Sequence, residues 1–153
     1  MIGGMDDHLP STEAAVTACR AIADEYAREI SVTHDIGADE TSRRTAAGVG
    51  VTTDPDGSLP HEAFVEFGGL PRVTVRLFPE DDALITVEGI DFPDLPRDEV
   101  PAFLHAVFGD RAHVKARRFP PGYRLVVPLP ADRTYKEYVP MFGLTPWLSS
   151  RVQ

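Results

Sequence analysis

The chain has 153 residues, of which 42% are apolar and 25% charged, and its formal net charge is −9. These values are typical of one globular domain and exclude a disordered chain, while the acidic charge argues against general nucleic-acid binding. No apolar run approaches the roughly 18 residues that cross a bilayer, so we expect no membrane-spanning segment.

The cysteine content and the N-terminus indicate the compartment. Cys19 is the only cysteine, which excludes an internal disulfide framework and a thiolate zinc site. Residues 1–8 contain neither the basic nor the apolar region of a secretory signal, so we predict a cytoplasmic protein. Thirteen arginines against two lysines fit the codon usage of a GC-rich bacterial genome.

The first sixty residues predict one helix and one short strand. Residues 1–10 are expected to be flexible. Ser11 is a good N-cap, and apolar residues then recur at helical spacing, which predicts a helix over 12–29. The polar composition of 31–45 predicts a loop with at most a short extended piece, and alternating apolar and glycine residues predict a strand near 47–52.

The next segment predicts an antiparallel meander. We expect strands at 62–67, 72–78 and 83–88, separated by turns rich in Gly, Pro and Asp. Alternate positions in these strands are apolar: Ala63, Val65, Phe67, Val73, Val75, Leu77, Ala83, Ile85 and Val87. The positions between them are mostly polar, which predicts a sheet covered on one face only.

A second helix and a hairpin follow the meander. Apolar residues at helical spacing predict a helix between Asp98 as its N-cap and Gly109 as its C-cap. Strands at 112–119 and 123–129 then form a hairpin around a Pro-Pro-Gly turn.

The last segment, 132–153, is aromatic and contains Pro140 and Pro146, which allow an extended piece and a helical turn. Its large aromatic residues are Tyr135, Tyr138, Phe142 and Trp147. They either anchor an interface or fold back onto the sheet to complete the core. The whole chain, 1–153, is thus predicted as a single α+β domain of two layers. Its antiparallel sheet carries two helices on one face, in the order α-β-β-β-β-α-β-β.

Charge is distributed unevenly along the chain. Residues 1–110 contain seven basic and twenty-two acidic residues, whereas 111–153 contain eight basic and two acidic ones. Six basic side chains belong to the predicted hairpin or flank it: Arg111, His113, Lys115, Arg117, Arg118 and Arg124. Alternation places several of them on one face, with Ala112, Val114 and Ala116 facing the core.

Two interpretations of this basic hairpin remain open. It is a docking face for an acidic protein, a phosphate or a nucleotide. Alternatively, Glu62, Glu66 or Glu88 on the same sheet neutralises it within the fold.

The five histidines form no H-x-H or H-x-x-x-H pattern, so the sequence predicts no metal site, and no motif indicates a cofactor. His105 and His113 could meet beside Asp110 as an acid–base pair. Gly48-Val49-Gly50 lacks the third glycine of a dinucleotide-binding turn.

The order of elements from Arg72 to Pro130, preceded by the helix at 12–29 and the strand at 62–67, resembles that of type III secretion chaperones and YbjN-like domains. This resemblance covers about two thirds of the chain. The strand near 47–52 is additional, and the two prolines of the tail prevent the long closing helix of those chaperones. The resemblance implies a small acidic dimer that binds a segment of another protein and catalyses no reaction.

We therefore expect a non-enzymatic protein-interaction module of chaperone-like, adaptor or immunity type. Its expected partner is another protein with an acidic segment. Two alternatives stay open: small-ligand or anion binding by the basic hairpin, and an enzyme built on His105 and His113.

Overall fold

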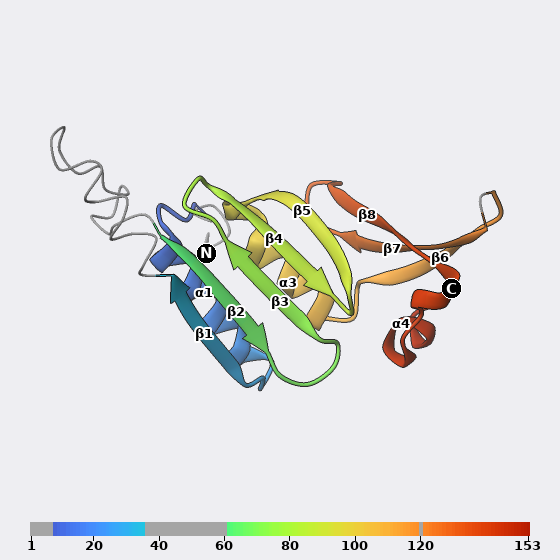
Figure 1. The fold of residues 1–153 in the computed structure, drawn as a ribbon, viewed down its shortest axis with the longest axis horizontal. Helices are drawn as coiled ribbons and strands as arrows, with labels where there is room; N and C mark the ends of the chain where they lie inside the picture. The colour runs from blue at the N-terminus through green and yellow to red at the C-terminus, as the bar shows by residue number, and fades with distance from the viewer. Residues whose placement is uncertain (1–7, 36–60, 120) are drawn as a thin grey trace, which may run out of the picture.

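The structure, a computed structural model, describes residues 8–35, 61–119 and 121–153, which form two antiparallel sheets and their helices (Figure 1). The five-stranded sheet has the order β1-β2-β3-β4-β5, with bounds Ile30–Asp35, Glu62–Phe67, Val73–Leu77, Asp82–Val87 and Ile90–Pro96. The three-stranded sheet has the order β6-β7-β8, with bounds His113–Arg117, Gly122–Pro128 and Thr134–Val139.

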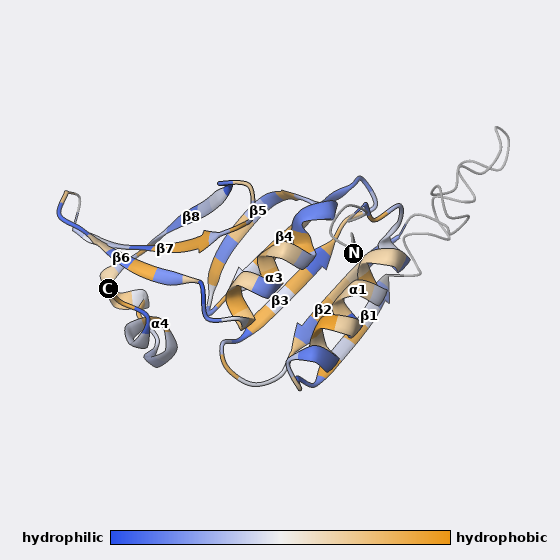
Figure 2. Ribbon diagram, turned by 180° about the vertical axis from the view of Figure 1, so that it is seen from behind, coloured by the Kyte–Doolittle hydropathy of each residue, from blue (hydrophilic) through white to orange (hydrophobic). Residues whose placement is uncertain are grey.

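Two helices cover one face of the five-stranded sheet. Helices α1 (Thr12–Glu25) and α3 (Val100–Phe108) pack against each other, and Figure 2 shows both on the same side of the sheet. A 3-10 turn, η2 (Arg97–Glu99), leads into α3, and another, η3 (Met141–Gly143), precedes the short helix α4 (Pro146–Ser150). The predicted α+β class is confirmed, and the order of elements is consistent with the predicted one, with β5 and β8 as additional strands.

The predicted meander forms the centre of the larger sheet. Strands β2, β3 and β4 pair so that Val65 lies opposite Val75, which in turn lies opposite Ile85. All three side chains are fully buried beneath the helices. Each buried Val or Ile contributes roughly 1.5–3 kcal/mol, so this row is a major part of the stabilising core.

Helix α1 begins and ends for local reasons. At its start, the Ser11 hydroxyl accepts a hydrogen bond from the Ala14 amide at 3.0 Å, as the sequence predicts for an N-cap. The helix ends at Glu25, four residues earlier than predicted, because Ala27 adopts a left-handed φ of 53°.

Strand β1 occupies the beginning of the segment that was predicted as a polar loop, 31–45. Its residues pair with β2 along the full strand, with Val32 opposite Val65. It is the short extended piece that the sequence allows within this segment. The rest of the predicted loop and the predicted strand near 47–52 lie outside the described residues.

Strand β5 is an additional edge strand that the sequence did not predict. It follows β4 through a tight turn at Glu88 and Gly89, whose φ angles of 51° and 84° match a hairpin turn of type I′. Pro93 and Pro96 are tolerated because an edge strand has a side without ladder hydrogen bonds.

Phe103 of α3 connects the two sheets. Its ring contacts Phe92 of β5 edge-on, with centroids 5.0 Å apart, and Tyr135 of β8 at 6.0 Å. Strands β5 and β8 lie side by side in Figures 1 and 2, so the two sheets share this aromatic contact. Strand β8 was predicted only as an extended piece of the tail.

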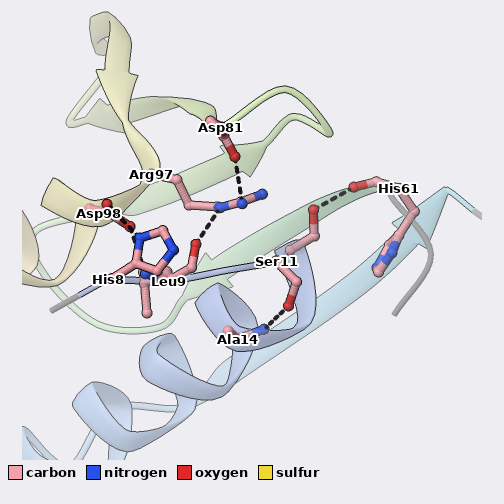
Figure 3. Close-up of polar contacts among 9 residues, drawn as sticks. His8, Leu9, Ser11, Ala14, His61, Asp81, Arg97 and Asp98 are labelled. Carbon is pink, nitrogen blue, oxygen red and sulfur yellow. Dashed lines mark hydrogen bonds and ion pairs between the residues drawn. The ribbon is translucent and has the colours of Figure 1, made fainter. Parts of the chain in front are cut away.

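The described part of the N-terminal segment is anchored by two neighbouring residues of η2 (Figure 3). The buried Arg97 donates to the Leu9 carbonyl at 3.0 Å and forms an ion pair with Asp81 at 2.6 Å. Asp98 accepts hydrogen bonds from the Leu9 amide at 2.6 Å and from the His8 ring at 3.1 Å. Residues 8–10, expected to be flexible, are therefore tied to the start of α3.

Asp98 is thus not the N-cap of α3 that the sequence predicts. The N-cap is Glu99, and no side chain caps the helix. Partial burial raises the pKa of Asp98, but the bonds from Leu9 and His8 and the charges of His8 and Arg97 outweigh it. Its pKa therefore lies below the ordinary carboxyl value. Gly109 is the C-cap, as predicted.

The C-terminal residues cover the outer edge of β6. The Val114 amide donates to the Arg151 carbonyl at 2.9 Å, and the Gln153 amide donates to the Val114 carbonyl at 3.0 Å. Trp147 is buried, whereas Phe142 is fully exposed. The tail contributes both to the core and to the surface.

Candidate functional site

The three-stranded sheet aligns basic side chains of β6 and β7 in a register that the sequence could not give. Lys115 lies directly opposite Arg124, which lies opposite Tyr138 of β8. One step along, Val126 lies between His113 and Lys136. Because strand positions alternate between faces, these side chains share one face of the sheet.

We call this surface the basic face, and define it by His113, Lys115, Arg117, Arg124, Lys136 and Tyr138. Lys115, Lys136 and Tyr138 are exposed, and Arg117 and Arg124 are half-buried. Val126, on the same face, is only 4% exposed and adds a buried apolar side chain between the basic ones. The opposite face carries the buried Val114 and Leu125, which pack into the core.

Of the other predicted basic residues, Arg111 precedes β6 and its carbonyl lies 3.2 Å from the His113 ring nitrogen. Arg118 is exposed at the β6–β7 turn, beside the exposed Phe119. Ala116, predicted to face the core with Val114, is exposed. Its position lies toward the tip of the hairpin, beyond the reach of the core.

The acidic residues proposed as neutralising groups belong to the other sheet, and two of them have partners of their own. Glu62 pairs with Arg76 at 3.5 Å, and Glu88 accepts a hydrogen bond from the Arg72 amide at 2.7 Å. Glu66 is exposed on β2.

Basic residues of the C-terminal part that lie off the basic face do form ion pairs. Arg133 pairs with Glu99, and Arg151 pairs with Asp110 at 2.8 Å. Within the described residues, by contrast, no carboxylate forms an ion pair with Lys115, Arg117 or Arg124. The basic face is therefore a concentration of positive charge that the described part of the fold does not neutralise.

The predicted aromatic residues divide into two groups. Tyr135 is half-buried and donates a hydrogen bond to Glu99; burial first, and then this bond, raise the pKa of Tyr135 to about 12. Trp147 is buried beneath the Arg151 guanidinium. Tyr138 and Phe142 are exposed, so only these two are available as surface anchors.

The predicted acid–base pair does not form. His105 of α3 contacts the Tyr26 hydroxyl at 3.0 Å and lies 3.9 Å from Glu25, whereas His113 bonds to the carbonyl of Arg111. Asp110 is paired with Arg151. Among the residues placed by the structure, no hydrogen bond or ion pair joins His105 to His113.

A second group of polar side chains, Glu13, His34 and His61, was missed in the sequence. Glu13 belongs to α1, His34 to β1, and His61 directly precedes β2; one potential ligand atom from each lies within 4.8 Å of the others. His34 and His61 are 27 positions apart, so no short sequence motif contains both of them. Only the pairing of β1 with β2 brings them together.

No protein-family model, curated protein or solved structure matches the chain. Within the ranges covered by the structure, no helix has the length and apolar character needed to cross a bilayer.

Proposed function

We propose that this protein is a non-enzymatic interaction module of chaperone-like, adaptor or immunity type, whose basic face binds an acidic segment of another protein. The observation that carries the proposal is the direct opposition of Lys115 and Arg124. Like charges directly opposite each other destabilise a sheet. A bound carboxylate would relieve that repulsion and so supply part of the binding free energy.

The shape of the face favours an extended protein segment over a small anion. Lys115 and Arg117 are two residues apart on one strand, which separates them by about 6.6–6.8 Å along its direction. Side chains on one side of an extended peptide recur at the same interval. A phosphate, in contrast, is bound best by donors that converge on one point.

The surroundings of the cations are suited to a protein partner. Tyr138, 44% exposed, continues the Lys115–Arg124 row, and its hydroxyl donates to the Pro121 carbonyl at 3.2 Å. Tyrosine and arginine are enriched among residues that dominate binding energy at protein interfaces. Phe119 is 89% exposed at the end of the same hairpin and offers an apolar anchor.

A charge-reversal experiment tests the proposal. The purified protein is titrated into a fluorescent peptide of alternating glutamate and serine, and binding is followed by fluorescence anisotropy. We expect K115E/R124E to weaken binding by about tenfold or more, and rising salt to weaken binding of the unaltered protein.

The matched control is R20E/R72E, which changes net charge equally at two exposed positions off the three-stranded sheet. Unchanged peptide affinity in K115E/R124E, or an equal loss in the control, would contradict the proposal. Tighter competition by ATP or inorganic phosphate than by unlabelled peptide would support the anion-binding alternative instead.

A further inference from the structure

We infer that Glu13, His34 and His61 form a binding site for a zinc-like divalent cation. The inference is independent of the basic face, which lies on the other sheet. It starts from the way three separate elements bring one carboxylate and two imidazoles together.

The fold places the two histidines on the helix-covered side of the β1–β2 pair. His34 lies directly opposite Ala63, which is buried beneath the helices, and His61 precedes Ala63 by two residues. They are therefore diagonal neighbours on one face, within reach of each other. Their rings lie 4.9 Å apart between centroids.

Helix α1 adds the carboxylate. Glu13 is in its first turn, next to Thr12, whose buried hydroxyl donates to the His61 carbonyl at 2.8 Å. This bond fixes the start of the helix to the backbone of one proposed ligand. The bond thus links the first turn of α1, which carries Glu13, to the residue that directly precedes β2.

The distances among the donor atoms approach those of a tetrahedral site. Glu13 Oε1 lies 3.5 Å from His61 Nε2 and 3.8 Å from His34 Nδ1, and the two nitrogens are 2.8 Å apart. Around a tetrahedral Zn²⁺ with bonds of about 2.0–2.1 Å, ligand atoms are roughly 3.3 Å apart. Each of the three distances between donor atoms therefore needs to change by only about half an ångström, and small side-chain rotations provide such a change.

The donor set determines the class of cation. Neutral imidazole nitrogens with one carboxylate suit Zn²⁺, Co²⁺ and Ni²⁺, whereas Mg²⁺ and Ca²⁺ prefer sites built from oxygen. The side chain of His61 is 9% exposed, that of His34 28% and that of Glu13 51%. An ion would therefore enter past Glu13 and be bound at the edge of the core.

Isothermal titration of chelator-treated protein with Zn²⁺ tests the site. We expect one ion per chain and no binding of Mg²⁺ under the same conditions. E13Q and H34Q each weaken Zn²⁺ binding by roughly tenfold or more, while both variants keep the circular dichroism spectrum of the unaltered protein.

The matched control is H105Q, because His105 also lies near a glutamate but has no second imidazole beside it. Two-dimensional NMR of the imidazole groups gives a second readout: Zn²⁺ shifts the His34 and His61 signals and leaves those of His105 and His113 in place. Absence of Zn²⁺ binding, or equal affinity in E13Q, H34Q and the unaltered protein, would overturn the inference.

Discussion

Lys115 on β6 and Arg124 on β7 lie directly opposite each other, so two cations occupy one cross-strand pair without an ion-pair partner among the described residues. A sheet under selection for stability alone would place a carboxylate at one of these positions, because opposite charges across a strand pair are favourable. This unpaired arrangement is the observation on which the proposed binding surface rests.

K115E is predicted to stabilise the protein while weakening its binding to an acidic peptide. The substitution converts a repulsive cross-strand pair into an attractive one, so the free energy of unfolding rises by about 0.5 kcal/mol. Urea unfolding measures the change, with K115A as the control that removes repulsion without adding attraction. A lower unfolding free energy in K115E than in K115A would refute this account of the pair.

F103A is predicted to lower the free energy of unfolding by about 3–5 kcal/mol, because it leaves a cavity in a fully buried site. The loss of stability is expected to affect both sheets, since the Phe103 ring contacts Phe92 of one sheet and Tyr135 of the other. Thermal unfolding followed by circular dichroism tests it. The fully exposed Phe142 provides the control, because F142A removes a ring of the same size with little effect on stability.

Asp98 is predicted to make stability depend on pH in the acidic range. Its folded-state pKa is lowered, so its contribution is present above the ordinary carboxyl pKa and is lost as pH falls through the folded value. The difference in unfolding free energy between the unaltered protein and D98N therefore shrinks on acidification. D132N, at an exposed turn residue, is the comparison. A difference that stays constant with pH would show that Asp98 does not titrate as described.

Cys19 is predicted to resist thiol reagents in the folded protein. Burial in the α1–sheet interface raises the pKa of its thiol to about 12, so almost no reactive thiolate forms near about pH 8. Labelling with a maleimide is expected to be slow in buffer and rapid in denaturing urea. Rapid labelling of the folded chain would contradict the packing of α1.

Regular periodicity explains which parts of the fold were predictable. The alternation of Val73, Val75 and Leu77 indicates a half-covered strand, and the helical spacing of Phe103, Leu104 and Val107 indicates a helix, since each pattern records a single buried face. Strand β5 alternates only from Ile90 to Phe92, because a register shift near Asp94 breaks the pattern before Leu95.

The candidate sites were predictable to different extents. The basic residues of the hairpin stand out in the sequence, but the opposition of Lys115 and Arg124 depends on the register of β6 against β7, which places Arg117 opposite Gly122. The group of Glu13, His34 and His61 depends on contacts between elements distant in the chain. Local residue spacing therefore cannot predict it.

The most direct measurement of the central claim is a nitrogen-15 NMR titration of the protein with the glutamate-serine peptide. The account predicts chemical-shift changes concentrated in β6, β7 and β8, centred on Lys115, Arg124 and Tyr138. It predicts unchanged signals for Val65 and Val75 in the larger sheet. Shifts confined to the five-stranded sheet and its helices, or no shifts at peptide excess, would contradict the assignment of the basic face as the binding surface.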